Sequence, residues 1–374
     1  MCRKLLVFCV ATLALIFNSA GKAEIEIVDL AGRFVTLPKP AKTFVISEGR
    51  YLSTLAILRP ENPVEGLVGM MSSLGWTHPR LQEQLYKSHP QAKDIALFGS
   101  REANSVSVEK IIDLSPDLAI FGIQDHGPNA KQRELIDLLT ASGTKVVFID
   151  FRMDPMRNTE RSIEIMGQVL GADARAQDYL NFYRARKQSI ITRAAAIEQR
   201  PSVFLQAHPG RMPCCWGMAD GMLGPLVELV GGQNIANKVA PGPTSHHTAE
   251  FLLVEDPDVW IGTASGTLEE FNQGKSPLAL GPGITPEMAR ESLQEIMGST
   301  EFQVLSAVRN NRAHSIWHNF YNSPMNIVAI EAFASWIHPD QFSDLNPEGT
   351  LKTIYQRFLP FKLEGTYTAT IDTP

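Results

Sequence analysis

Arginine, histidine and aromatic residues recur where short β-branched runs of the sequence end. The candidates for ligand binding are Arg50, Tyr51, Trp76, Arg101, His126, Arg152, His208, Arg211, Trp216, Trp317, His318 and Tyr321. Guanidinium groups bind carboxylates and phenolates through paired hydrogen bonds, and aromatic rings offer stacking area. Surface loops also often carry solvated arginines, so the shared placement is the stronger evidence. The pattern predicts a cleft for a planar or bulky anionic ligand, and an iron chelate with acidic groups fits it.

The segment 211–222 contains two adjacent cysteines, Cys214 and Cys215. Thiolates are soft ligands for copper or iron, and they can also hold haem or a cluster. The alternative is a vicinal disulfide that shapes a turn in an oxidising compartment, and we favour this or a plain structural role. His246 and His247 could add metal ligands, but no spacing matches a zinc pattern. A metal site at these four residues is therefore the weaker hypothesis.

The sequence offers little for catalysis. It contains no Gly-x-Ser-x-Gly, His-Glu-x-x-His, Walker or Gly-x-Gly-x-x-Gly motif. We therefore expect a protein that is not an enzyme and has no cofactor of its own. The remaining catalytic alternative is an exported metal- or thiol-dependent enzyme that uses Cys214 and Cys215.

The elements that must position these residues alternate between strands and helices, which predicts βαβ units and largely parallel sheets. In the first half, strands are expected at 44–47, 64–70, 95–98, 118–121 and 146–149, with helices at 51–58, 81–87, 108–114 and 130–141. In the second half, strands are expected at 203–205, 259–261 and 313–317, with helices at 222–230, 323–337 and 348–358.

The middle of the chain differs. A helix is expected at 156–170, and a second one from its cap Asp173 to about Gln199 would be roughly 40 Å long. The predicted fold class is α/β, with two Rossmann-like lobes of mainly parallel sheets joined by one long spine helix. The lobes are expected at 24–155 and 201–374, with the connecting helices at 156–200.

The N-terminus has the pattern of a signal peptide. Arg3 and Lys4 precede an apolar run at 5–17, and small residues follow it. We expect cleavage near Ala23 and a periplasmic, freely diffusing protein. The signal holds three basic residues and no acidic ones, so cleavage moves the net charge from −6 to −9. A mildly acidic chain without basic runs argues against nucleic acid or an anionic membrane surface as a partner.

Two segments form a weak internal repeat. Residues 109–122 and 250–263 each contain a glutamate, a short apolar helix, a Pro-Asp turn and a buried strand. Any junction of helix, Pro-Asp turn and strand has some of these features. The glutamates Glu109 and Glu250 at the same offset make coincidence less attractive.

These segments resemble the periplasmic binding proteins that serve ABC importers of ferric siderophores, haem and vitamin B12. Residues 28–38 look like the first hairpin of that family, and residues 109–121 and 250–261 look like its two lobe signatures. The resemblance covers about 25–359. It implies two lobes on a nearly rigid helix, a ligand in the cleft between them, and Glu109 and Glu250 as docking points for arginines of a permease dimer.

The expected function is therefore capture of a ferric siderophore, or a related iron or metal chelate, for delivery to an inner-membrane permease. Receptors for haem, a corrinoid or a bare transition-metal ion are the alternatives. The protein is expected to act as a monomer, and the sequence does not name the chelate.

Overall fold

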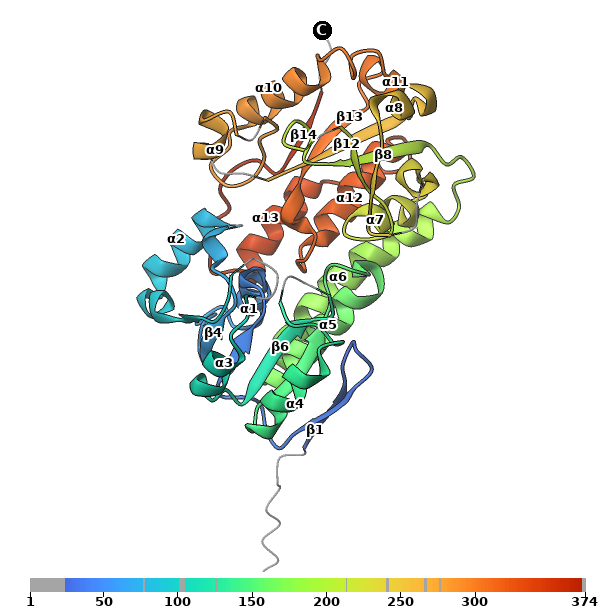
Figure 1. Cartoon of the computed structure of the whole chain (residues 1–374). Helices are drawn as coiled ribbons and strands as arrows, with labels where there is room; N and C mark the ends of the chain where they lie inside the picture. The colour runs from blue at the N-terminus through green and yellow to red at the C-terminus, as the bar shows by residue number, and fades with distance from the viewer. Residues whose placement is uncertain are drawn as a thin grey trace, which may run out of the picture.

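The computed structural model describes residues 24–76, 78–100, 105–124, 127–212, 214–239, 242–265, 268–275 and 277–371. The predicted signal peptide at 1–23 lies outside this part. Two α/β lobes are stacked along the molecule, with helices between them (Figure 1). Across the described residues, no helix is both long and apolar enough to cross a membrane.

The first lobe contains a five-stranded sheet in the order β5-β4-β3-β6-β7, in which every pair is parallel. Its strands are β3 (Phe44–Ile46), β4 (Leu67–Met70), β5 (Ala96–Leu97), β6 (Leu118–Gly122) and β7 (Lys145–Ile149). The hairpin of β1 (Ile25–Val28) and β2 (Phe34–Leu37) precedes them. The helices are α1 (Leu52–Leu58), α2 (Pro79–Ser88), α3 (Val108–Leu114) and α4 (Arg133–Ala141).

The second lobe contains a seven-stranded sheet in the order β11-β9-β8-β12-β13-β14, with β10 also paired to β8. Its strands are β8 (Ser202–Ala207), β9 (Trp216–Met218), β10 (Gln233–Asn234), β11 (Thr244–His246), β12 (Val259–Ala264), β13 (Ala313–Trp317) and β14 (Thr368–Thr370). The centre of the sheet is parallel, whereas β9, β11 and β14 are antiparallel to their neighbours. The helices are α7 (Gly224–Leu229), α8 (Ala249–Glu255), α9 (Leu268–Asn272), α10 (Pro286–Met297), α11 (Ser306–Arg309), α12 (Asn326–Ile337) and α13 (Pro347–Phe358).

The order of the strands in each sheet indicates where a ligand is expected to bind. In the first lobe the chain runs outward from β3 to β5 and then returns to β6 on the other side of β3. In the second lobe β10 and β12 lie on opposite sides of β8. Open α/β sheets bind ligands beyond the carboxyl ends of the strands at such reversals. The segments after β3, β6, β8 and β12 are therefore the places to examine.

Two helices connect the lobes, α5 (Pro155–Leu170) and α6 (Asp173–Ala194). Helix α6 contains 22 residues, so it is about 33 Å long and shorter than the sequence predicts. It ends at Ala194, and the residues that follow are mostly exposed. Asp173 is the first residue of the helix and Ala172 its cap, which corrects the predicted cap.

Helix α6 contacts both lobes. It packs against α1 and α5 on one side and against α12 on the other. The hydroxyls of Tyr179 and Tyr183 bond the carbonyl of Pro324 and Oδ1 of Asn326, each at 2.8 Å. Arg186 pairs with the buried Glu331 at 3.1 Å. One apolar cluster runs through both lobes and these helices, while a second one covers the face of the first sheet below α3 and α4.

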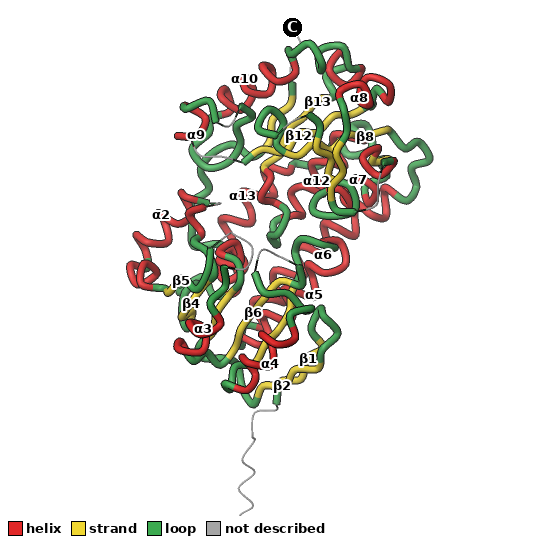
Figure 2. Tube along the Cα trace, in the orientation of Figure 1, coloured by secondary structure: helices red, strands yellow, loops and turns green. Residues whose placement is uncertain are grey.

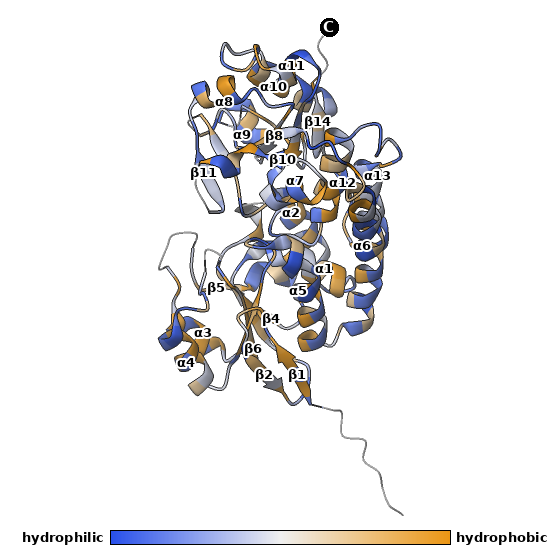
Figure 3. Ribbon diagram, turned by 90° about the vertical axis from the view of Figure 1, so that its right-hand side faces the viewer, coloured by the Kyte–Doolittle hydropathy of each residue, from blue (hydrophilic) through white to orange (hydrophobic). Residues whose placement is uncertain are grey.

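The hydrophobic pattern explains the layers. In β3, Phe44 and Ile46 belong to the large cluster, while Val45 between them belongs to the second one. Alternate side chains of a strand point to opposite faces, so a continuous apolar run means that both faces are covered. Helices and loops surround the strands of both sheets (Figure 2), and hydrophobic colour is concentrated on strands such as β4 and β6 (Figure 3).

Candidate ligand-binding site between the lobes

Arg50 connects the two lobes. It lies in the 3₁₀ turn Gly49–Tyr51 after β3, and its side chain is buried. Oε2 of Glu48 accepts hydrogen bonds from its Nε at 2.9 Å and is 2.8 Å from its Nη2. Nη1 of Arg50 donates to the hydroxyl of Tyr321, and the guanidinium lies 5.0 Å from the centre of the Tyr321 ring. Because Tyr321 follows β13, this contact joins the carboxyl ends of strands from both sheets.

Two histidines of the second lobe lie beside this contact. His208 follows β8 and His318 follows β13, and their ring centres are 3.9 Å apart. Nδ1 of His318 is 2.8 Å from Oγ1 of Thr263, and its ring meets that of Tyr321 edge-on at 4.8 Å. Burial and the nearby charge of Arg211 lower the pKa of His208 to about 4. Both rings are polar groups placed at the junction of the lobes.

Three arginines act on His318 at once. Burial is the largest cause that lowers the pKa of His318, followed by His208 and then by the charges of Arg50, Arg152 and Arg211. The interaction between charges falls with distance, so arginines from both lobes lie near this imidazole. Nη1 of Arg152 is 3.4 Å from the carbonyl of Gln124, while Nη2 of Arg211 is 3.5 Å from Glu270. This concentration of positive charge suits an anion.

The loop 150–154 after β7 carries Arg152 and is held rigidly. The carboxylate of Asp150 accepts backbone hydrogen bonds from residues 152, 153 and 154 and a side-chain bond from Asn158. Two consecutive carbonyls of this loop accept from the second lobe, Phe151 from the N–H of Asn322 and Arg152 from that of Met222.

Residues with strained backbone conformations lie at this junction of the two lobes. His208, Met222 and Asn322 have φ values of 46°, 56° and 55°. Non-glycine residues rarely adopt this left-handed conformation, and it occurs preferentially at functional sites. The three residues all lie where the second lobe meets the cleft or the loop 150–154, which supports a functional role for this junction.

Other predicted site residues are placed differently. Tyr51 and Trp317 are in the packed core, with 0% and 1% of their surface exposed. Trp317 packs edge-on against His78, Phe320 and Tyr367. Trp216, on β9, contacts His246. Arg101, His126 and the side chain of Trp76 lie outside the described residues.

Sequence reasoning missed several residues that shape this junction. Glu48 and Thr263 hold Arg50 and His318, Asp150 holds the loop of Arg152, and His78 is buried against Trp317. The residues that these side chains contact are distant in sequence or are reached through a turn. The spacing of residues in the sequence therefore did not predict these contacts. The local signal nearest to Asp150 is Asp154-Pro155, which marks the start of α5 and not the role of Asp150.

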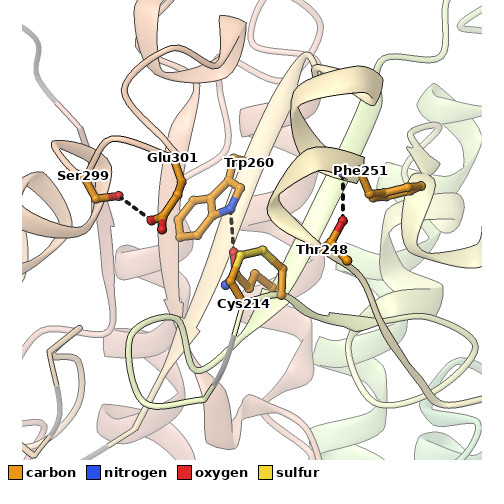
Figure 4. Close-up of a disulfide and its surroundings, with 8 residues drawn as sticks. Cys214, Thr248, Phe251, Trp260, Ser299 and Glu301 are labelled. Carbon is orange, nitrogen blue, oxygen red and sulfur yellow. Dashed lines mark hydrogen bonds between the residues drawn. A yellow bond between two sulfur atoms is a disulfide. The ribbon is translucent and has the colours of Figure 1, made fainter.

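Cys214 and Cys215 are joined in a vicinal disulfide (Figure 4). The backbone N–H and carbonyl of Cys215 both bond His247, at 2.6 and 2.9 Å, which continues the pairing of β9 with β11. The ring of His247 is buried between Phe204 and Phe251, while His246 is exposed. The four weak candidates for metal binding are thus not assembled around one point, and their sulfurs are bonded to each other.

The two predicted docking glutamates occupy equivalent places. Glu109 is in the first turn of α3, which Ser107 caps, and Glu250 is in the first turn of α8, which Thr248 caps (Figure 4). Both carboxylates are exposed. The N–H of Glu250 and the hydroxyl of Thr248 hold the pKa of the Glu250 carboxyl below its usual value. The helix N-terminus also favours a negative charge here.

Comparisons with known proteins agree with this architecture. FepB, a TroA-like periplasmic binding protein from Veillonella parvula, superposes with a TM-score of 0.81 at 24% identity, over 93% of this chain and 100% of that chain. The molybdate-binding protein MolA from Haemophilus influenzae gives 0.63 at 16% identity, over 91% and 99%. An Fe³⁺-hydroxamate transport protein from Saccharomonospora viridis gives 0.53 at 18% identity, over 84% and 98%. These likenesses establish the fold.

No curated protein sequence matches the chain. A family model described as periplasmic binding protein matches residues 67–316, about two thirds of the chain. That match runs from β4 into β13, so it includes part of each lobe and the connecting helices between them. The family consists of extracytoplasmic solute-binding proteins that work with membrane permeases of ABC transporters. The chain belongs to the periplasmic binding protein family.

Proposed function

We propose that the protein captures a ferric siderophore, or a related iron or metal chelate, in the cleft between its lobes. One observation carries the proposal: the charges of Arg50, Arg152 and Arg211 act together on the single imidazole of His318. Chelates with carboxylate, catecholate or hydroxamate groups present oxygen acceptors, and guanidinium groups bind such acceptors in pairs.

The three arginines are not equivalent. Glu48 compensates the charge of Arg50, and Glu270 lies near the exposed Arg211. Nη1 of Arg152 bonds the carbonyl of Gln124, and Asp150 holds the loop that carries this side chain. We assign Arg152 a part in binding the anion from this fixed loop, while Arg50 and Tyr321 fix the relation of the lobes around it.

Delivery to an inner-membrane permease dimer would use Glu109 and Glu250. Their helices begin in the same way, and α6 with its neighbours holds the two lobes at a fixed separation. Two carboxylates on a stiff body can match two cations of a partner, and charge complementarity sets register and association rate. We further propose that the protein is exported with cleavage near Ala23 and acts as a monomer.

Haem or a corrinoid could occupy the same cleft and remains the alternative. A bare transition-metal ion receives less support, because the charges of three arginines act on His318 in the cleft and the cysteines are bonded to each other. The same disulfide removes the free thiols that an exported thiol-dependent enzyme would need.

The test is a ligand screen on the mature protein by tryptophan fluorescence. Ferric hydroxamate, catecholate and citrate complexes, haem, cobalamin and free metal ions would each be titrated. We expect saturable quenching by at least one anionic iron chelate. Quenching by haem or cobalamin alone would show that this compound, and not an iron chelate, is the cargo. If no compound quenches the fluorescence, the proposal is overturned.

A further inference from the structure

Helix α8 carries apolar side chains on the face that also carries Glu250. Leu253 and Val254 follow Glu250 by three and four residues, and residues at this spacing share one face of a helix. Val254 is 84% exposed and Leu253 is 45% exposed. The helix packs onto the lobe from its other side, where Leu252 is buried and Phe251 is half-buried. The two exposed side chains therefore add little to the core of the lobe.

A third exposed apolar side chain lies near the end of α8. Val304 is 47% exposed and precedes α11 by two residues. The carboxylate of Asp256, which caps the end of α8, accepts hydrogen bonds from the N–H and the hydroxyl of Ser306 at 2.7 and 2.6 Å. These bonds tie α11 to α8, and the two helices are neighbours at the end of the second lobe (Figure 1). We call Leu253, Val254 and Val304 the apolar patch.

The equivalent helix of the first lobe is polar at the corresponding place. In the internal repeat Glu109 aligns with Glu250, and the exposed Asp113 aligns with Val254. Helices α3 and α8 have seven residues each, begin at a capping hydroxyl and end at a residue in the left-handed conformation. The shared local fold therefore does not require an apolar residue at position 254. Each lobe presents a glutamate in a first helical turn, but the second lobe has a valine where the first has another carboxylate.

We propose that the apolar patch contacts the permease subunit that meets Glu250, and that this subunit has an apolar surface beside the cation that pairs with Glu250. This inference rests on the proposed docking through Glu109 and Glu250. Helices α3 and α8 lie on the side of the molecule opposite α6 (Figure 3), so a partner on that side can reach both. Single exposed apolar residues are common on protein surfaces, whereas interfaces combine an apolar centre with charged groups around it. The second lobe thus adds apolar contact to the charge pairing that both lobes supply.

The experiment measures binding of labelled mature protein to right-side-out membrane vesicles from the cells that produce it. Leu253→Ser/Val254→Ser should weaken binding by about tenfold. Its remaining binding should be more sensitive to NaCl than that of the wild type, because salt screens charge pairs and does not screen apolar contact. Val254→Asp copies Asp113 of the first lobe and should also weaken binding, whereas docking by charge alone predicts tighter binding. Phe34→Ser, which removes an 89% exposed ring from the β1–β2 hairpin, is the control and should change nothing.

The outcomes separate this inference from the docking assignment and from ligand capture. Wild-type affinity in the serine variant, or tighter binding of Val254→Asp, overturns the inference and leaves docking through the glutamates intact. If the wild type does not bind the vesicles, or if Glu109→Lys/Glu250→Lys binds as the wild type does, the docking assignment fails and the inference fails with it.

Two other occupants of the apolar patch have their own controls. Equal binding to protein-free liposomes of the same lipids would assign the patch to the membrane surface. Dimers of the wild type that the serine variant does not form in sedimentation would assign it to a second copy of the chain. Either result overturns the inference. Melting curves verify that each variant is folded, and ligand capture is measured separately by the fluorescence screen.

Discussion

At the residue scale, the arginines of the cleft are held in place in different ways. Arg50 is buried with Glu48 and is committed to Tyr321, so it contributes to the fixed relation of the lobes. Arg152 extends from a loop that Asp150 holds through both carboxylate oxygens. A side chain on such a rigid loop loses little freedom when it binds a ligand, which favours affinity.

The residue-scale prediction concerns Arg152. Arg152→Ala should weaken binding of the chelate that quenches fluorescence by about tenfold to a hundredfold, because a charge-assisted hydrogen bond contributes about 1.5–3 kcal/mol. Arg152→Lys should be intermediate, since lysine keeps the charge without the planar fork. Arg157→Ala, which removes an exposed arginine of α5, is the control and should change nothing. Equal affinities for Arg152→Ala and the wild type would rule out the assigned role.

At the scale of elements, the two Pro-Asp turns have the same structure. Oδ2 of Asp117 accepts from the N–H groups of Lys42 and Thr43, and the N–H of Asp117 donates to the hydroxyl of Thr43. In the second lobe, Asp258 exchanges equivalent bonds with Ser202. Each aspartate thus ties the start of a central buried strand to the start of the strand beside it. The repeat seen in the sequence reflects this reciprocal contact.

Removal of either carboxylate should therefore destabilise its lobe. Asp117→Ala and Asp258→Ala should each lower the free energy of unfolding by about 1–3 kcal/mol, because two backbone or hydroxyl donors lose their acceptor. Urea denaturation measures this effect. Asp113→Ala, on the exposed face of α3, is the matched control and should stay within about 0.5 kcal/mol of the wild type. A control that is as destabilised as the two variants would contradict the explanation.

At the scale of the whole molecule, buried histidines make stability depend on pH. Burial lowers the pKa of His78 and of His314 to about 3, and that of His208 to about 4, from 6.5. The unfolded chain therefore binds more protons than the folded one between these values. Stability is complete above pH 6.5 and declines as the pH falls toward 4.

The measurement is the urea midpoint between pH 7.5 and pH 4.5, which should fall steadily below about pH 6.5. His314→Gln can keep a hydrogen bond to Thr370 but removes one titrating group, so its midpoint should fall less steeply. A variant slope equal to that of the wild type would show that His314 does not contribute.

Docking is also a property of the whole molecule, because it depends on the distance between two lobes. The double variant Glu109→Lys/Glu250→Lys should abolish uptake by intact cells and leave ligand affinity unchanged, since both carboxylates are exposed in the first turns of α3 and α8 and neither belongs to the cleft contacts. Glu198→Lys/Glu295→Lys makes the same change of charge at other exposed acids. Uptake that persists in the first variant, or is lost in the second, would refute the docking assignment.

The sequence by itself determined the order and kind of most elements. Strands such as 118–121 and 146–149 are continuous apolar runs, and α3, α5 and α12 have the expected apolar spacing, so local pattern was sufficient. The short strands β9, β10, β11 and β14 gave no such signal, because two or three mixed residues in a strand are stabilised by their neighbours and not by their own pattern.

Only the tertiary structure decided which candidates lie together. It placed His208, His318 and Tyr321 side by side and brought three arginines near His318, whereas Tyr51 and Trp317 were packed into the core. The physical reason is that the sequence specifies which residue follows each strand. The burial of that residue and its charged neighbours depend instead on how the two sheets face each other across α6. Local pattern specifies each lobe; the packing of one lobe against the other creates the site.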